Sequence, residues 1–233
     1  TEYYAYATPD GPVVRGRWVD PSTGYIYFAD NDGRLESAGW VVTGDYTGGA
    51  LQRYWIDEDA HAAIPGFSED GWDHLTTSEG YVARGRHEVY DEENNRTLVY
   101  LADNDGRLAG GASGGWVVSD DYGQGLQRYW IDPQEHAAVV GYDDGSEGAG
   151  NWAHYTTEKG YVLRGGDDFD DGRYWADNDG RVSRGGWVIT GAFTGGALER
   201  YWAGDDGAFL ACGAFDTGLG YWAYAKADTS ILR

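Results

Sequence analysis

The chain has 233 residues, with 39 Asp and Glu against 17 Lys and Arg, so its formal net charge at pH 7 is −22. This acidity argues against nucleic-acid binding, because no basic surface offsets the phosphate charge. The single cysteine, Cys212, excludes an internal disulfide and a cysteine zinc cluster. The sequence contains no run of about 18 apolar residues, so no membrane-spanning helix is predicted. With 11 Trp and 19 Tyr the chain is too aromatic to be disordered.

Three copies of a long repeat organise the sequence. The string ADNDGR occurs at 29–34, 102–107 and 176–181, and each copy is followed by Gly-Trp-Val and later by Arg-Tyr-Trp. Self-similarity with a period of about 73 residues indicates a repeat architecture. We therefore predict a single repeat domain over 1–233, divided into an N-terminal capping hairpin and three long repeats: 1–16, 17–85, 86–165 and 166–233. The chain starts without Met or a secretory leader, so we expect a fragment or a processed chain.

Each long repeat divides into three shorter segments, such as 25–40, 54–67 and 72–85. Every segment has an aromatic cluster, a turn, and a short apolar run that ends in Gly, which is typical of half-buried strands joined by tight turns. No window shows a sustained apolar period of 3.6 residues, so almost no helix is expected. The predicted fold is an all-β solenoid of stacked short β-hairpins, because a lone hairpin cannot bury enough area to be stable.

The DNDG strings have two interpretations. Asp and Asn followed by Gly favour a turn, because these residues tolerate positive φ and hydrogen-bond their own backbone. The same carboxylates are weak calcium candidates, although no Glu stands at the closing position that a calcium loop needs. We favour the turn and keep calcium as a minor hypothesis for three pairs of aspartates: Asp30 and Asp32, Asp103 and Asp105, Asp177 and Asp179.

The histidines give no sign of catalysis. His61 and His136 share an HAA string, and His74 and His154 share a WxHxTT string. Recurrence in register favours a structural role or a repeated binding role, whereas a catalytic site is expected to be unique. The histidines lack zinc-ligand spacing, and the sequence shows no serine-hydrolase, phosphate-loop or dinucleotide signature. We therefore predict no catalytic residues, no cofactor and no enzyme activity in this chain.

The repeats resemble the cell-wall-binding repeats of Gram-positive bacteria, which include choline-binding and glucan-binding modules. The segment 174–180, Tyr-Trp-Ala-Asp-Asn-Asp-Gly, followed by Gly186 and Trp187, is similar to one such repeat. The resemblance implies stacked hairpins, an extracellular location at the cell wall or cell surface, and a targeting role beside wall hydrolases, adhesins or glucan-synthesising enzymes.

The resemblance also implies an aromatic cage between consecutive hairpins. In that family, two tryptophans and a further aromatic hold choline by cation–π attraction. Here the Gly-Trp element and the aromatic pair are present. The Trp that directly precedes the aromatic pair in that family is replaced by arginine in four hairpins, and by Ile26 and Val99 in two others. An arginine is expected to repel a quaternary ammonium and to stack on the rings itself, which makes choline a doubtful ligand. The four arginines are Arg53, Arg128, Arg173 and Arg200.

The predicted function is non-catalytic attachment to bacterial wall polysaccharide or glycan through aromatic seams between hairpins. Most aromatics are expected to be core. The ligand-binding candidates are Trp40, Tyr54, Trp55, Trp72, Trp116, Tyr129, Trp130, Trp152, Trp187, Tyr201, Trp202 and Tyr221. Two alternatives stay open: a structural spacer that binds nothing, and the targeting part of a cell-wall hydrolase whose catalytic domain lies outside this chain.

Two further expectations concern the arginine rows and the single cysteine. The arginine rows are expected to form surface ion pairs of little energetic value with neighbouring aspartates. Cys212 is expected to be a small core residue of a modified last repeat. The rows comprise Arg34, Arg107 and Arg181, and Arg53, Arg128 and Arg200.

Overall fold

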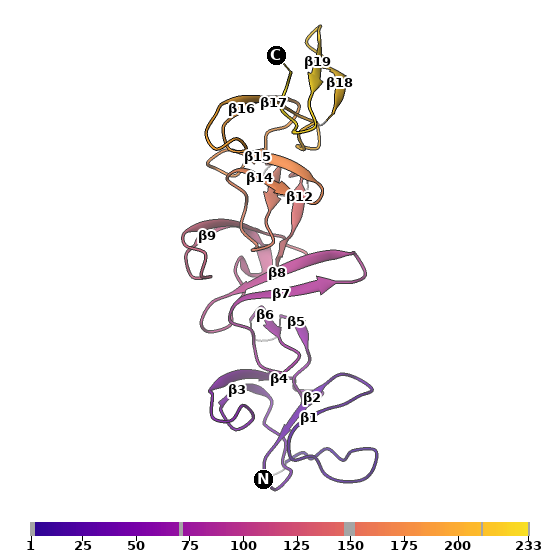
Figure 1. The fold of residues 1–233 in the computed structure, drawn as a ribbon. Coiled ribbons are helices and arrows are strands. Elements are labelled where there is room, and N and C mark those ends of the chain that lie inside the picture. Colours follow the sequence, from indigo (N-terminus) through magenta and orange to yellow (C-terminus); the bar gives the residue numbers. More distant parts are fainter. Residues whose placement is uncertain (1–2, 70–71, 147–151, 211, 233) are drawn as a thin grey trace. The chain divides into compact units, whose positions relative to one another are not determined.

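The computed structural model describes residues 3–69, 72–146, 152–210 and 212–232. Within these ranges the chain is built from short antiparallel strands (Figure 1). The one helical element among the described residues is a single 3-10 turn, η1 (Gly111–Ser113). No helix in this part of the chain is long and apolar enough to cross a membrane. The all-β fold predicted from the sequence is confirmed.

The strands pair in chain order as hairpins, and one hairpin gains a third strand. β11 (Ala138–Val139) adds to β8, and the other sheets of the described residues have two strands each. The hairpins are β1 (Gly16–Val19) with β2 (Ile26–Ala29), β3 (Gly39–Thr43) with β4 (Gln52–Ile56), β5 (Gly66–Ser68) with β6 (His74–Thr76), β7 (Gly85–Asp91) with β8 (Arg96–Ala102), β9 (Gly115–Ser119) with β10 (Gln127–Ile131), β12 (Gly141–Asp143) with β13 (His154–Thr156), β14 (Gly165–Phe169) with β15 (Gly172–Ala176), β16 (Gly186–Thr190) with β17 (Glu199–Ala203), and β18 (Gly213–Asp216) with β19 (Trp222–Ala225).

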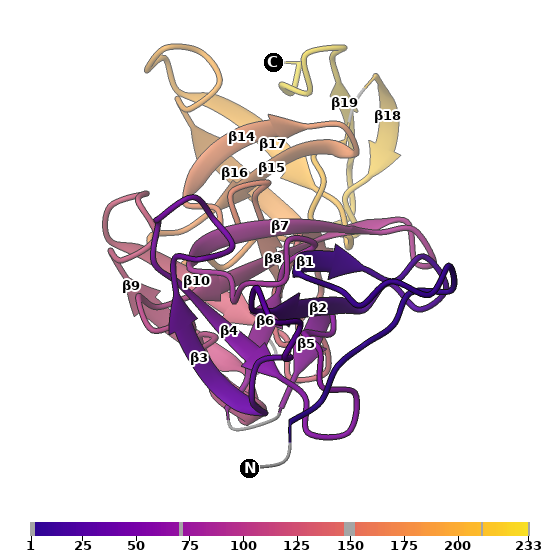
Figure 2. The same ribbon diagram turned by 90° about the horizontal axis from the view of Figure 1, so that it is seen from below.

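The chain divides into two compact units. Unit 1 comprises Thr1–Glu88, Tyr100–Ser113 and Asp121–Gly123, and unit 2 comprises Val89–Val99, Gly114–Asp120 and Gln124–Arg233. Within unit 1, the β1–β2 and β3–β4 hairpins point in different directions, as Figure 2 shows. The single continuous repeat domain inferred from the sequence stays a prediction.

A tight turn follows the second strand of the β1–β2 hairpin, at the first DNDG string. The Asp30 carboxylate accepts hydrogen bonds from the backbone N–H groups of Asp32 (2.8 Å) and Arg34 (2.9 Å). Gly33 has a φ of +81°, and Ala29 forms an antiparallel bridge with Leu35 across the turn. The turns that start at 103 and 177 repeat these bonds, so the turn interpretation of the DNDG strings is confirmed.

A recurrent backbone hydrogen bond ties three of the hairpins to earlier ones. The Val82 N–H, directly after the turn that follows β6, donates to the carbonyl of Arg53 in β4 (2.7 Å). The same bond joins Val162 to Arg128 (2.8 Å) and Ile231 to Arg200. The hairpins therefore stack through polar backbone contacts that no single hairpin can satisfy within itself.

Tyrosines from the Arg-Tyr-Trp strings lie at the centre of the packing. Tyr54, Tyr129 and Tyr201 are almost fully buried. Around Tyr54 the core contains Phe28 and Ile56, and the rings of Phe28 and Tyr54 meet edge to face with centroids 4.7 Å apart. Aromatic side chains thus provide burial that aliphatic side chains provide in most small domains.

The prediction for Cys212 is wrong. Its side chain is exposed, and its backbone has a φ of 50°, which places it in the left-handed region at the start of the last hairpin. The apolar sequence context is misleading here, because the residue occupies a turn-like backbone position whose side chain points away from the core.

The turn glycines make a sharp stability test. At Gly106 the φ is +92°, and a Cβ would lie 2.5 Å from a methyl of Val82 in the preceding hairpin. At Gly85 the φ is +72° and the space is open. We expect Gly106→Ala to lower the free energy of unfolding by about 2–4 kcal/mol, because backbone strain and overpacking add, and Gly85→Ala by about 1 kcal/mol from strain alone. Chemical denaturation of both variants checks this, and equal losses would contradict the role of the close contact.

Candidate functional site: the aromatic seams

The predicted site residues gather where hairpins meet. Seam 1 is defined by Trp40, Trp55, Trp72 and His74. Trp40 in β3 faces Trp55 in β4 across the ladder, with ring centroids 4.9 Å apart. Trp72, just before β6, brings its ring to 4.6 Å from Trp40, and His74 approaches Trp40 edge-on at 5.1 Å. One hairpin supplies the first two rings and the next hairpin supplies the other two.

Seam 2 repeats this arrangement in unit 2 and is defined by Trp116, Trp130, Trp152 and His154. The Trp116 ring lies 5.1 Å from Trp130, 5.4 Å from Trp152 and 5.3 Å from His154. All four positions have the same residue type as in seam 1, three tryptophans and one histidine, so the sequence repeat is reproduced as a repeated packing motif.

The seam histidines are buried and structural. The Nδ1 atom of His74 donates to the Trp72 carbonyl (2.8 Å), and that of His154 donates to the Trp152 carbonyl (3.1 Å). Burial lowers the pKa of His154, and the bond to the Trp152 carbonyl opposes this shift in part. Each ring therefore fixes the Trp two residues before it, as the structural interpretation of their recurrence predicts.

Arginines cover the rings of seams 1 and 2. In seam 1 the Arg107 guanidinium lies 4.3 Å from the Trp72 ring centroid, and the Arg53 guanidinium lies 5.3 Å from Trp72 and 5.7 Å from Trp40. These distances are in the cation–π range. The expectation that Arg53 stacks on the rings of its cage is confirmed.

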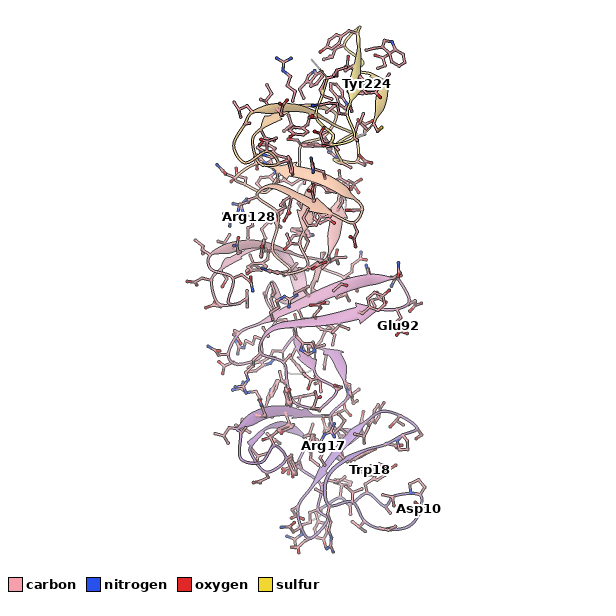
Figure 3. The ribbon with its side chains drawn as sticks, in the orientation of Figure 1. Asp10, Arg17, Trp18, Glu92, Arg128 and Tyr224 are labelled. Carbon is pink, nitrogen blue, oxygen red and sulfur yellow. The ribbon has the colours of Figure 1, made fainter. Side chains whose placement is uncertain are left out.

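Seam 2 is covered in the same way. Arg181 lies 3.8 Å from the Trp152 centroid, and Arg128, labelled in Figure 3, lies 5.6 Å from Trp152 and 5.9 Å from Trp116. The chain thus places its own cations on the ring faces that the family resemblance assigns to a ligand cation.

The strand arginines also reach turns that lie far ahead in the sequence. Arg53 Nη2 donates to the Asp105 carboxylate (3.0 Å), and Arg128 Nη1 donates to the Asp179 carbonyl (2.7 Å). Arg173 bonds the Asp228 carbonyl (2.8 Å) in the same manner. Each of these three side chains therefore clamps a later hairpin.

The ion-pair expectation for the arginine rows is confirmed in part. Arg34 pairs with Asp32 (3.6 Å), Arg53 with Asp105 (3.0 Å) and Arg128 with Asp179 (3.6 Å). The aspartates are largely exposed, so each pair contributes little by itself. Arg107 and Arg181 instead make the ring contacts described above, a role that sequence spacing alone does not reveal.

Seam 3 has a different composition and is defined by Trp187, Trp202 and Tyr221. The two tryptophans meet edge to face across the β16–β17 ladder at 5.0 Å, and the indole N–H of Trp187 donates to the Tyr221 hydroxyl (3.1 Å). By sequence register, Ala223 takes the place of the seam histidine. Among the described residues no arginine lies over a ring of seam 3, and Arg200 is exposed.

The predicted site residues fall into two groups. Tyr54, Tyr129 and Tyr201 lie in the core, where no ring face reaches solvent, and Trp130 is also buried. The other eight are at least partly exposed at the seams. A ligand is therefore limited to seam rings, and Tyr221 is among the most accessible, with 49% of its surface exposed.

The described residues give no support to calcium binding. In this part of the chain no group of three or more His, Cys, Asp or Glu side chains is placed to hold a metal ion. One oxygen each of Asp30, Asp103 and Asp177 accepts the turn hydrogen bonds. The first carboxylate of each DNDG string is thus engaged in turn geometry, and the second lies in an exposed ion pair with an arginine.

Comparison with known proteins establishes the fold. No family model and no curated protein sequence matches the chain. Choline-binding protein F from Streptococcus pneumoniae has a similar structure, with a TM-score of 0.54, 18% identity, and coverage of 99% of this chain and 84% of that one. The resemblance to choline-binding-like repeats that the sequence indicates is confirmed for the fold.

Two other solved structures show weaker similarity. The choline-binding domain of CbpL from Streptococcus pneumoniae has a TM-score of 0.41 at 17% identity, over 84% of this chain and 87% of that one. An alternansucrase in complex with isomaltononaose has a TM-score of 0.38 at 15% identity, over 99% of this chain and 16% of that one.

The strand arginines permit a matched stability comparison. We expect Arg53→Gln to lower the free energy of unfolding by about 1–2 kcal/mol, because it removes two ring contacts and one exposed ion pair. Arg200→Gln changes the same repeat position where the side chain is exposed, so its effect is expected to stay within about 0.5 kcal/mol. Thermal or chemical unfolding measures both, and equal effects would show that the ring contacts of Arg53 add no stability.

The buried histidine of seam 2 predicts a pH dependence. Because the folded-state pKa of His154 lies below its unfolded value, its stabilising contribution is complete above pH about 6.5 and is lost as the pH falls toward the folded pKa. We expect the stability lost between pH 8 and pH 5 to be smaller in His154→Asn than in the wild type. Denaturant midpoints at several pH values test this, and an unchanged slope would contradict it.

Proposed function

We propose that this chain is a non-catalytic attachment module that binds wall carbohydrate or glycan at the bacterial cell surface, with seam 3 as its main contact. The single observation that carries the proposal is that seam 3 has aromatic rings without an arginine over them, whereas seams 1 and 2 are covered by the chain's own guanidinium groups. The similarity in fold to choline-binding protein F supports a surface-binding role.

The chemistry of seam 3 suits a sugar ring. Trp187 and Trp202 offer apolar ring surface, and the exposed Tyr221 hydroxyl provides a polar group beside them. Sugars pack their apolar faces on such rings while their hydroxyls find hydrogen-bond partners, which combines apolar burial with orientation. The binding energy of one shallow site is small, so attachment to a polymer gains from repeated contacts.

Choline is a natural competitor for the same rings. The arginine argument against choline applies to seams 1 and 2, where guanidinium groups stand 3.8 to 5.9 Å from the ring centroids. Among the described residues no arginine lies over a ring of seam 3, so the arginine argument does not exclude choline there. Competition by free choline therefore separates a quaternary ammonium ligand from a glycan.

A structural spacer is the second candidate, and the covered seams favour it. If the arginines of seams 1 and 2 act only as internal cross-links, most of the chain contributes length and rigidity without contacting a ligand. The spacer then differs from the attachment module in one measurable property, which is binding of the isolated chain to purified walls.

The test is a pull-down of the 233-residue chain with purified Gram-positive cell walls, with and without excess choline. We expect wall binding that resists choline, and a loss of about tenfold or more in Trp187→Ala, because an aromatic platform contributes about 1–3 kcal/mol. Trp222→Ala is the control: this ring is more exposed, at 70%, and lies outside the seam definition.

Each outcome discriminates between the candidates. Equal losses in Trp187→Ala and Trp222→Ala would indicate unspecific adhesion by exposed rings and would contradict a seam site. Binding abolished by choline would assign a choline-type ligand to seam 3 in place of a glycan. No binding to any wall would favour the spacer.

A further inference from the structure

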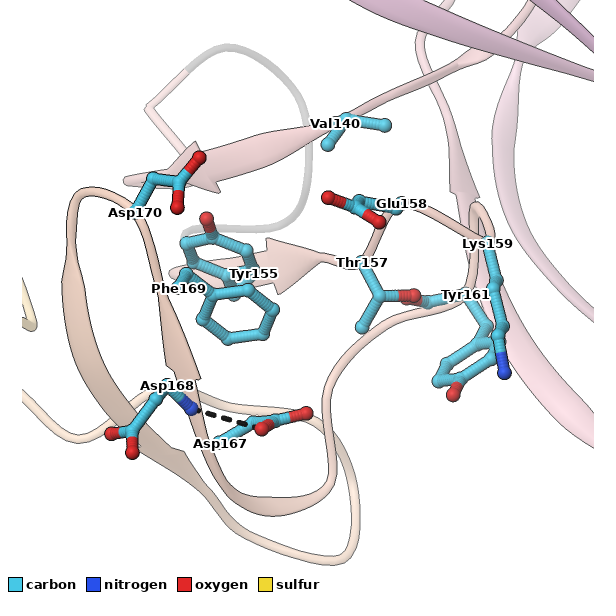
Figure 4. Close-up of a pocket in the computed structure, with 10 residues that line it drawn as sticks. All are labelled: Val140, Tyr155, Thr157, Glu158, Lys159, Tyr161, Asp167, Asp168, Phe169 and Asp170. Atoms are coloured by element: carbon cyan, nitrogen blue, oxygen red, sulfur yellow. Dashed lines mark hydrogen bonds between the residues drawn. The ribbon is translucent and has the colours of Figure 1, made fainter.

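A groove in unit 2 is separate from all three seams. It has a volume of about 410 Å³, within the range of small-molecule sites, and no tryptophan lines it. Its wall comes from β13, from the turn that follows β13, and from β14 with the turn after it (Figure 4). All ten lining residues are described by the structure and belong to unit 2.

One wall of the groove is a fixed aromatic pair. The rings of Tyr155 and Phe169 stack with centroids 3.8 Å apart and an angle of 19° between their planes. Burial raises the pKa of Tyr155, and the hydrogen bond that its hydroxyl donates to the Asp171 carboxylate (3.0 Å) raises this pKa further and holds the ring in place. Phe169 remains partly exposed, so the pair presents a rigid apolar surface to the groove.

Carboxylates stand around this aromatic surface. In the view of Figure 4, Asp167 and Asp168 lie on one side of the stacked rings and Asp170 lies on the other, and Lys159 lies beside Tyr161, away from the rings. One oxygen of Asp167 accepts a backbone hydrogen bond from Asp168 (2.9 Å). The other oxygen stays available as an acceptor.

The aspartates differ in how far they are already engaged. Asp168 is held by the Arg173 guanidinium, with an Nη2–Oδ2 distance of 3.0 Å. The Asp170 side chain is exposed and has no hydrogen-bond partner among the described residues. Asp167 and Asp170 therefore place negative charge next to the apolar ring pair, while Lys159 is the one cation among the described residues of the groove lining. Glu158 adds a further carboxylate to the lining.

This combination selects for a particular ligand chemistry. An apolar ring surface suits the face of a sugar, and carboxylate acceptors suit N–H and O–H donors. A quaternary ammonium group has no N–H to donate, so it gains less binding energy from a carboxylate-lined groove than from an aromatic cage. A protonated primary amine on a sugar ring uses both the ring pair and the carboxylates.

We infer that this groove binds a protonated amino-sugar oligomer, with one sugar ring against Phe169 and separate ammonium groups donating to Asp167 on one side of the ring pair and to Asp170 on the other. The inference does not rest on the seams, because the groove shares no residue with them. It gives the chain a second carbohydrate contact whose selectivity is set by charge.

The test is calorimetric titration of the full chain with the fully deacetylated trimer of glucosamine and, separately, with its fully N-acetylated counterpart. We expect the deacetylated trimer to bind about tenfold or more tightly than the acetylated one, because acetylation removes the ammonium charge. We expect D167N/D170N to weaken binding of the deacetylated trimer by about tenfold or more. F169L, which keeps apolar volume but removes the ring face, is expected to weaken binding of both trimers.

The control must account for the large negative charge of the whole protein. D10N/D120N removes the same charge at two exposed positions outside the groove and is expected to leave affinity within about twofold. Equal weakening in the two double variants would show diffuse charge attraction and would overturn the inference. Equal affinity for the two trimers, or no saturable binding, would overturn it as well.

Two further measurements separate binding at the groove from loss of folding and from binding at seam 3. Unchanged thermal unfolding of D167N/D170N and F169L shows that any lost affinity comes from the groove. Because seam 3 is itself a proposed sugar site, the comparison for Trp187→Ala is the ratio of the two affinities, and we expect the preference for the deacetylated over the acetylated trimer to remain. If Trp187→Ala abolishes this preference and D167N/D170N does not, the amino sugar binds at seam 3 and the groove inference is wrong.

Discussion

The stack depends on one residue position, the arginine that precedes the buried tyrosine of the Arg-Tyr-Trp strings. The Arg53 carbonyl accepts the Val82 N–H (2.7 Å), and its guanidinium reaches Asp105 in a hairpin further along the chain. Arg128 makes the equivalent pair of contacts with Val162 and with the Asp179 carbonyl. A short hairpin alone leaves the backbone groups of its edge strands without hydrogen-bond partners and its aromatic rings exposed. The contacts with later hairpins supply both, and they stabilise hairpins that are only marginally stable alone.

The same guanidinium groups determine which aromatic surface is available. Where an arginine stacks on Trp72 or Trp152, the ring is used for internal cohesion and is closed to an external cation. Cation–π contacts of this kind serve equally well within a chain and between a chain and a ligand. Stability and binding therefore compete for the same rings. This competition is absent at seam 3, because the Arg200 carbonyl still accepts the backbone hydrogen bond from Ile231 while the Arg200 side chain is exposed.

Much of the fold could be predicted because its causes are local. The DNDG string encodes a turn through the Asp30 carboxylate and the positive φ of Gly33, and both act within five residues. The placement of Arg53 on the cage rings also followed from its position in a repeated motif. The contacts of Arg107 and Arg181 were not predicted, because they join hairpins that are far apart in sequence and the nearby aspartates offered a simpler explanation. The exposure of Cys212 was missed since apolar neighbours in sequence do not report a left-handed backbone.

The sequence by itself determined the repeat, the all-β class, the turns and the set of aromatic side chains, because these depend on residue type and short spacing. The tertiary structure alone decided which of those rings are core, which are covered by arginine and which are open. It also decided that Tyr155, Phe169 and Asp167 meet in one groove, although their sequence pattern carries no such signal. The physical reason is that ring exposure and charge pairing arise only when hairpins stack, so two identical Trp residues acquire different roles from their neighbours in space.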